Sequence, residues 1–224
     1  MKLSEHTVSV LKNYANINQN LVVKEGNELL TMSSMKNIVA KATVAESFPR
    51  ELAIYDLNEF LAALSLFKSP VLDFDDQFVT IKEENNPTNS LKYFYSDPSV
   101  VQTPSKTITM PSEEVTFEFS NSDLSKMKKA SAVICAPDMT LERTNGSSSL
   151  VAKDKKNDTA NNYSLDVNTN GGGDFKFFFK VENLKLMDGS YDVAISSKNI
   201  SHFKNKSSDV EYWIALEPES TYSV

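Results

Sequence analysis

Cysteine and histidine are scarce in this chain of 224 residues, and long apolar runs are absent. The single cysteine, Cys135, excludes an internal disulfide framework and fits a reducing compartment. With His6 and His202 as the only histidines, the chain has too few ligands for a zinc site of the Cys/His type. No segment approaches a membrane span, and the N-terminus lacks the apolar core of a signal peptide. We therefore expect a soluble cytosolic protein.

Motifs of the common catalytic classes are also missing. The sequence has no Gly-x4-Gly-Lys-Ser/Thr phosphate loop and no His-Glu-x2-His zinc helix. The glycines at 171–173 precede a strand pattern, which favours a hairpin turn over a phosphate cradle. Asp73, Asp75 and Asp76 fit a divalent-ion cluster less well than an exposed acidic turn. Since no nucleophile, base and orienting residue form a set, we predict no enzymatic activity, no catalytic residues, no metal and no cofactor.

Charge is the next constraint. The formal net charge is −7. It divides into −3 on residues 1–112 (10 Lys and Arg, 13 Asp and Glu) and −4 on residues 113–224 (13 and 17). A nucleic-acid-binding domain is ordinarily basic. Net charge does not report distribution, however, because an acidic outer surface is compatible with a basic inner one.

What the chain does contain is a repeat. Residues 1–96 and 115–224 follow one plan, and a connector rich in Pro, Ser and Thr separates them at 97–114. A shift of 116 residues sets the helical pattern at 4–17 against the one at 122–133. Both copies end in an aromatic strand that runs into an acidic residue and a proline. The sequence therefore predicts an N-terminal domain, an interdomain connector and a similar C-terminal domain.

Apolar periodicity predicts an α+β fold in which each copy has antiparallel strands and two short helices. In the first copy the helices are expected to begin after Ser4 and Asp56. In the second copy they are expected at about 122–134 and 181–187.

Two further expectations concern pairing and order. The apolar runs at 21–23 and 29–32 predict a hairpin that turns at 24–27. The tail at 217–224 is expected to be loose.

The positive signal is lysine in or beside the predicted helices, at Lys2, Lys12, Lys68, Lys126, Lys128, Lys129 and Lys185. Lysines meet phosphates as mobile point charges and read no bases. The competing interpretation is an ordinary solvated helix face. The helix after Asp56 supports that alternative, because Asp56 and Glu59 outweigh Lys68.

Five segments carry a resemblance to a known family, at 1–4, 11–13, 53–61, 97–99 and 215–217. Together they resemble the sliding clamps of T-even-type bacteriophages, which are DNA polymerase processivity factors. The resemblance covers nearly the whole chain, including its length, its two-copy plan and its acidic balance. The stretch 138–175 matches least.

The resemblance implies a DNA clamp fold, with two similar domains whose helices pack on antiparallel sheets, in a ring-shaped homotrimer. A head-to-tail contact makes a ring when its rotation closes. The helices would line the hole, so that the lysines named above and Asn16 face DNA while the outside stays acidic. Sliding requires weak contacts, and the only two arginines, Arg50 and Arg143, lie outside the predicted helices.

The resemblance also implies two kinds of protein contact. A C-terminal peptide of the polymerase would dock against the connector and the last strand, at Val101, Ile108, Met110, Ala215, Leu216 and Pro218. Ordinary packing between domains is the alternative for these residues. Subunits would join through edge strands at 91–95 and 163–167, which place Tyr93, Tyr95, Tyr163 and Leu165 at the interface.

The implied function is a clamp that encircles duplex DNA without sequence preference and tethers the phage DNA polymerase. Its other implied partners are an ATP-driven clamp loader and a sigma-like factor of late transcription, in the cytoplasm of the infected bacterial host and without a membrane. The alternative hypothesis is a phage structural or receptor-binding virion protein, because a β-rich chain with much Asn, Ser and Thr also suits a virion part.

Overall fold

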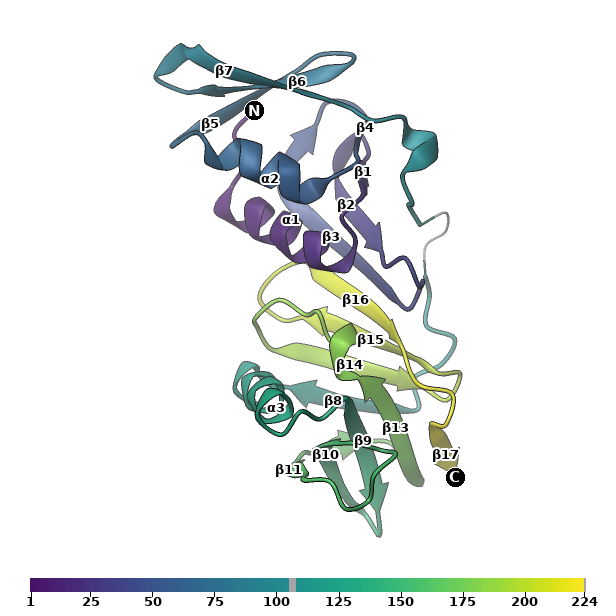
Figure 1. The fold of residues 1–224 in the computed structure, drawn as a ribbon. Coiled ribbons are helices and arrows are strands. Elements are labelled where there is room, and N and C mark those ends of the chain that lie inside the picture. The colour runs from purple at the N-terminus through teal and green to yellow at the C-terminus, as the bar shows by residue number, and fades with distance from the viewer. Residues whose placement is uncertain (105–107, 224) are drawn as a thin grey trace. The chain divides into compact units, whose positions relative to one another are not determined.

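The computed structural model describes residues 1–104 and 108–223, apart from the side chain of residue 87. Within it the chain divides into two compact units, residues 1–106 and 107–224 (Figure 1). The predicted connector at 97–114 is therefore shared between the units. It begins with the short 3-10 helix η1 (Pro98–Val100), which Asp97 caps at the backbone N–H of Ser99.

Besides η1, the described part of the first unit has two α-helices and seven strands. The helices are α1 (Glu5–Ile17) and α2 (Leu57–Ser65). The strands are β1 (Leu21–Val23), β2 (Gly26–Met32), β3 (Ile38–Phe48), β4 (Leu52–Ile54), β5 (Pro70–Phe74), β6 (Phe78–Glu83) and β7 (Asn86–Phe94). Strand β1 pairs with β4, β2 pairs with β3, and β5, β6 and β7 form an antiparallel sheet in that order.

The predicted hairpin between 21–23 and 29–32 is wrong. Strand β1 pairs antiparallel with β4, which sets Leu21 opposite Ile54, and β2 takes β3 as its partner instead. All three residues of β1 and of β4 are buried. Because both strands are fully apolar, burying them side by side in the core removes more apolar surface from water than a local hairpin would.

Helix α1 shows why the local sequence folds as it does. The Ser4 hydroxyl accepts a hydrogen bond from the backbone N–H of Thr7, which satisfies one of the free donors at the start of the helix. Val10, Leu11 and Tyr14 are fully buried, and helical spacing puts them on one face. The helix packs on that face against α2 and β3 (Figure 1).

The second unit contains one α-helix, α3 (Asn121–Val133), and the 3-10 helix η2 (Val181–Asn183). Its strands are β8 (Val115–Phe119), β9 (Asp138–Thr144), β10 (Ser147–Lys153), β11 (Tyr163–Asp166), β12 (Thr169–Asn170), β13 (Asp174–Lys180), β14 (Tyr191–Ser196), β15 (Ile200–Asn205), β16 (Val210–Ala215) and β17 (Thr221–Ser223). One set of neighbouring strands runs β12-β8-β14-β15-β16, and another runs β11-β10-β9-β13-β17.

The two units repeat one helix closely. Helices α1 and α3 have 13 residues each, and both begin after a serine N-cap, Ser4 in one and Ser120 in the other. The predicted shift of 116 residues relates these two caps. In both helices the capping hydroxyl accepts from the N–H three residues on.

The predicted fourth helix is wrong, as is the loose tail. Residues 181–187 form only the three-residue turn η2, after which buried Leu184 and Leu186 alternate with half-buried Lys185 as in extended chain. The tail contains β17, which pairs with β13 and sets Tyr222 opposite Phe175. The Tyr222 ring also stacks on Phe177 at 6.4 Å, so apolar contact holds the end of the chain.

Candidate nucleic-acid interface and docking surfaces

Helix α1 presents a polar face opposite its buried one. Glu5, Ser9, Lys12 and Asn16 are all exposed, at intervals of three and four residues that place them in one row along the helix. Asn16 donates its side-chain amide to the carbonyl of Lys12 at 3.1 Å. Lys12 and Asn16, both predicted to face nucleic acid, therefore do lie together.

Helix α3 carries a basic face. Lys126 and Lys129 are exposed and lie three residues apart, next to the exposed Ser122 and Ser125. The Lys126 ammonium lies 3.3 Å from the carboxylate of Asp123, one turn earlier. An exposed pair of this kind is weak, so Lys126 can exchange this partner for another anion at little cost.

Lys128 does not belong to this face. Its ammonium donates to the backbone carbonyl of Leu186 at 2.9 Å, and the side chain is partly buried. Burial lowers the pKa of Lys128, although the nearby charge of Asp188 opposes the effect. The prediction that Lys128 faces DNA loses its basis, because the side chain is used inside the second unit.

The other predicted lysines are dispersed. Lys2 forms an ion pair of 2.9 Å with Glu84. Lys68 is exposed beyond the end of α2, and its backbone N–H donates to Glu83 at 2.8 Å. Lys185 is half-buried in the extended segment after η2. Lys2 and Lys68 therefore each lie near a glutamate, and the predicted lysines that are exposed on helix faces are Lys12, Lys126 and Lys129.

Strand β7 borders an open apolar groove. The groove has a volume of about 660 Å³ and lies between α2 and β7. Leu66 and Phe94 line it with 68% and 64% of their surfaces exposed, and Tyr55 is exposed beside them. Strand β7 is an outer strand of its sheet, since β6 is its one partner among the described residues. A free strand edge beside exposed apolar side chains is typical of a protein interface.

The two tyrosines predicted at this edge are partly used by their own unit. Tyr93 donates its hydroxyl to the carbonyl of Asp56 at 3.2 Å and packs edge-on against Phe60 at 5.2 Å. Burial raises the pKa of Tyr93 to about 12, so its hydroxyl stays protonated. Tyr95 lines the groove, and its hydroxyl is buried without a hydrogen-bond partner in the described part of the chain.

Strand β11 is one of the two outer strands of its sheet, and β10 is its one partner in the part of the chain that the structure describes. It sets Tyr163 opposite Ala152 and Leu165 opposite Leu150 of β10. Both predicted interface residues, Tyr163 and Leu165, are half-buried and lie on one side of the strand. Helix α3 packs beside β10 and β11. Val133, the last residue of α3, is 81% exposed.

The residues predicted for partner-peptide binding differ in exposure. Val101 is buried in a cluster with Val22 and Ala53, and Leu216 is buried as well. Ile108, Met110 and Ala215 are half-buried, and Pro218 is exposed. Val101 therefore serves the core of the first unit, and a peptide has better access to the other four.

Sequence analysis missed the groove at α2. Tyr55, Leu66 and Phe94 are the large apolar residues that remain exposed there. Leu66 follows the buried pair Ala63 and Leu64, outside the buried stripe of α2, and Phe94 alternates with the half-buried Tyr93 and Tyr95. An apolar residue on the polar side of a predicted element was the available signal.

Metal-ligand clusters and membrane-spanning helices are not found in the described part of the chain. Among the described residues, no three His, Cys, Asp or Glu side chains gather to hold a metal ion. In the same part of the chain, no helix combines the length and apolar character needed to cross a membrane.

Two family models match the chain. Residues 2–93 match the model described as DNA polymerase processivity factor. Residues 116–218 match the model described as gp45 sliding clamp, C terminal. Each match falls within one of the two units.

Curated relatives match over their full length. A sliding clamp of Vibrio phage KVP40 is 33% identical over 97% of this chain and 99% of its own. Sliding clamps of Escherichia phage RB69 and Enterobacteria phage T4 are 29% and 28% identical, each over 99% of both chains.

Solved structures show the same fold at low identity. Proliferating cellular nuclear antigen (PCNA) of Entamoeba histolytica aligns with a TM-score of 0.68 at 14% identity, over 94% of both chains. PCNA of Thermococcus kodakaraensis aligns with a TM-score of 0.69 at 17% identity, over 95% of this chain and 96% of its own.

Proposed function

This chain belongs to the family of sliding clamps of T4-type bacteriophages, and we propose that it acts in replication as a ring around duplex DNA. It is a processivity factor for DNA polymerase. The observation that carries this conclusion is the full-length relationship to the Vibrio phage clamp. That relationship replaces the alternative of a virion protein.

The DNA-facing surface in this proposal consists of the exposed faces of α1 and α3. Lys12, Asn16, Lys126 and Lys129 supply charge and hydrogen bonds from short polar rows. Contacts of this kind go to phosphates and carry no sequence information. Lys128 is not part of this surface. Lys2, Lys68 and Lys185 lie outside α1 and α3, so they do not belong to its two rows either.

The ring in this proposal is a homotrimer that closes head to tail. The edge of β7 and its groove in one copy meet the edge of β11 in the next, so that Tyr93 and Tyr95 face Tyr163 and Leu165 across the contact. Both strands are outer strands of their sheets. Two different surfaces that meet head to tail generate a closed ring when the rotation fits.

The clamp in this proposal tethers its partners through short peptides. Ile108, Met110, Ala215 and Pro218 of the second unit would contact the C-terminal peptide of the polymerase. Their accessibility supports this assignment. An ATP-driven loader would open the ring, a sigma-like factor of late transcription would use the same contacts, and the clamp itself would have no enzymatic activity. All of this would take place in the cytoplasm of the infected host.

The decisive experiment tests topology. The chain is loaded with its phage's clamp loader and ATP onto nicked circular duplex DNA, and retention is measured by gel filtration before and after one cut with a restriction enzyme. A ring stays on the circle and slides off the linear product within minutes. Retention that is equal on both forms would show ordinary binding and refute the encircling ring.

A further inference from the structure

The C-terminal segment is joined to β13 by hydrogen bonds of its backbone and of one serine side chain. After β16, the N–H of Glu217 donates to the carbonyl of Phe178 at 2.8 Å. The N–H of Phe178 in turn donates to the hydroxyl of Ser220 at 3.0 Å. Strand β17 then continues the pairing along β13. Residues 216–220, which we name the C-terminal strap, therefore lie across the middle of β13.

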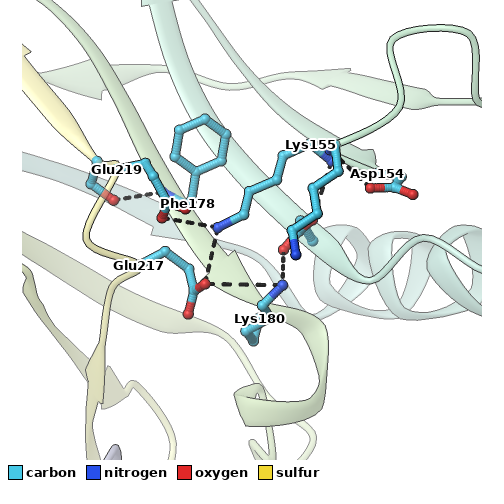
Figure 2. Close-up of polar contacts among 9 residues, drawn as sticks. Asp154, Lys155, Phe178, Lys180, Glu217 and Glu219 are labelled. Atoms are coloured by element: carbon cyan, nitrogen blue, oxygen red, sulfur yellow. Dashed lines mark hydrogen bonds and ion pairs between the residues drawn. The ribbon is translucent and has the colours of Figure 1, made fainter.

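The side chain of Lys155 also contacts this strap. Its ammonium lies between two carboxylates of the strap, 2.9 Å from Glu217 and 3.1 Å from Glu219 (Figure 2). Only 9% of the Lys155 side chain is exposed. The ammonium also lies 5.4 Å from the centre of the Phe178 ring. One half-buried cation thus bridges the two residues that flank Pro218.

A buried carboxylate of the second unit, Asp138, also takes part in these polar contacts. Asp138 is 1% exposed, and it accepts from the Lys180 ammonium at 2.6 Å and from the backbone N–H of Lys155 at 3.2 Å. Lys180 also lies 3.9 Å from Glu217. Burial works to lower the pKa of Lys155, but the hydrogen bonds that its ammonium donates to Glu217 and Glu219 outweigh burial and raise the pKa. Lys155 therefore stays charged in its half-buried position.

We propose that Lys155 is a positioning residue for partner binding, which fixes the strap so that Pro218 is held out toward a docking peptide. This inference rests on the proposed function, since it assumes that the polymerase peptide binds beside Ala215 and Pro218. Pro218 is exposed while the glutamates on either side of it are tied down. Holding these residues in advance lowers the ordering cost that binding would otherwise carry.

The test compares two neighbouring lysines. Lys155→Met removes the ammonium and keeps a long apolar stem for Phe178, whereas Lys156→Met changes an exposed lysine of the same loop. Hydrogen–deuterium exchange reports the amides of Glu217 and Ser220. A fluorescent peptide of the C-terminal residues of the same phage's polymerase reports affinity. We expect Lys155→Met to speed exchange in the strap and to weaken peptide binding about tenfold, and Lys156→Met to match the wild type.

Two more variants keep the inference testable if Lys155→Met folds poorly. Glu219→Gln changes an exposed side chain and removes one of the two ion pairs, so it should show a smaller loss in both measurements. Lys155→Arg keeps the charge and can still bridge two carboxylates, so it should restore most of the affinity.

The outcomes separate the two proposals. If strap exchange rises while the peptide binds as in the wild type, Lys155 only supports the fold and the inference is overturned. If exchange does not change, the ion pairs do not hold the strap, and the inference is also overturned. If the wild-type chain itself fails to bind the peptide, the peptide site of the proposed function is overturned, and the role of Lys155 falls with it.

Discussion

At the residue scale, the proposed function assigns DNA contacts to two lysines of α3. Lys126 and Lys129 are exposed on α3. Changing both to glutamate reverses the charge of the proposed DNA-facing surface and removes no buried contact. We expect the length of DNA made in one polymerase binding event to fall severalfold, and the loss to grow with salt because the remaining attraction is weaker. Primer extension on a singly primed circle measures this length.

The control for this double variant is Lys156→Glu with Lys198→Glu. Both residues are exposed lysines of the second unit outside α3, and the change in net charge is the same. Processivity should remain near the wild-type value in the control. An equal loss in both double variants would mean that overall charge matters and the α3 face does not.

Lys128 should behave in the opposite way from its neighbours. A glutamate at this position would place a carboxylate against the Leu186 carbonyl and near Asp188. We expect Lys128→Glu to lower the free energy of unfolding by about 1–3 kcal/mol, and Lys126→Glu to change it by about 0.5 kcal/mol or less. Urea denaturation of both variants measures the difference, and equal midpoints would contradict the buried role.

Residue placement was predictable only in part, and α1 and α3 show why. The shift of 116 sets Lys12 against Lys128, but Lys12 is exposed and Lys128 is partly buried. The two helices bury faces that differ by about one residue, which is about 100° of rotation. Sequence periodicity predicts that a helix exists more reliably than it predicts which face of the helix is buried, because the neighbouring elements decide which face is covered.

At the scale of elements, Glu46 ties the start of α1 to β3. Its carboxylate accepts hydrogen bonds from the backbone N–H of Ser4 and from the hydroxyl of Thr7. Burial works to raise the pKa of Glu46, but these hydrogen bonds outweigh it and lower the pKa from its ordinary value of 4.5. The ionised carboxylate therefore stabilises the fold above the unfolded-state pKa, and this stability is lost as the pH falls through the lower folded-state pKa.

Glu46→Gln tests this link. The variant keeps the shape and loses the charge, so we expect the first unit to lose about 1 kcal/mol of stability at neutral pH, a value that includes screening by solvent. Its stability should also depend less on pH than that of the wild type below about pH 4.5. Urea denaturation across this range measures both, with exposed Glu51→Gln as the control. An unchanged acid slope in Glu46→Gln would count against the role of Glu46.

The elements that sequence analysis missed have a common cause. Strands β1 and β4 are too short for their sequences to indicate a partner. The sequence pattern therefore predicts that β1 pairs with the nearest apolar run, whereas its partner β4 lies about thirty residues away. The tail has a polar composition, and its order comes from Tyr222 on Phe177 and from pairing with β13. Long-range contacts decided both cases, whereas the existence of α1 and α3 and the Ser4 cap of α1 depend on local sequence and were predicted correctly.

At the scale of the whole molecule, the proposed trimer makes the groove beside β7 the most sensitive surface. Phe94 is 64% exposed, so its loss costs the isolated subunit little. In a closed ring the same side chain would be covered by the next subunit, and a charge there would be buried without a partner. We expect Phe94→Glu to weaken assembly far more than it weakens folding.

Light scattering across a concentration series measures this directly. The wild type should approach about 75 kDa, three times the 25.0 kDa of one chain, and Phe94→Glu should stay near 25.0 kDa. The matched control is Met35→Glu, because Met35 is 80% exposed in the first unit, between β2 and β3, away from the groove. If Phe94→Glu stays trimeric, the contact lies elsewhere. If both variants dissociate, added negative charge in an already acidic chain is the cause, and the groove has no special role.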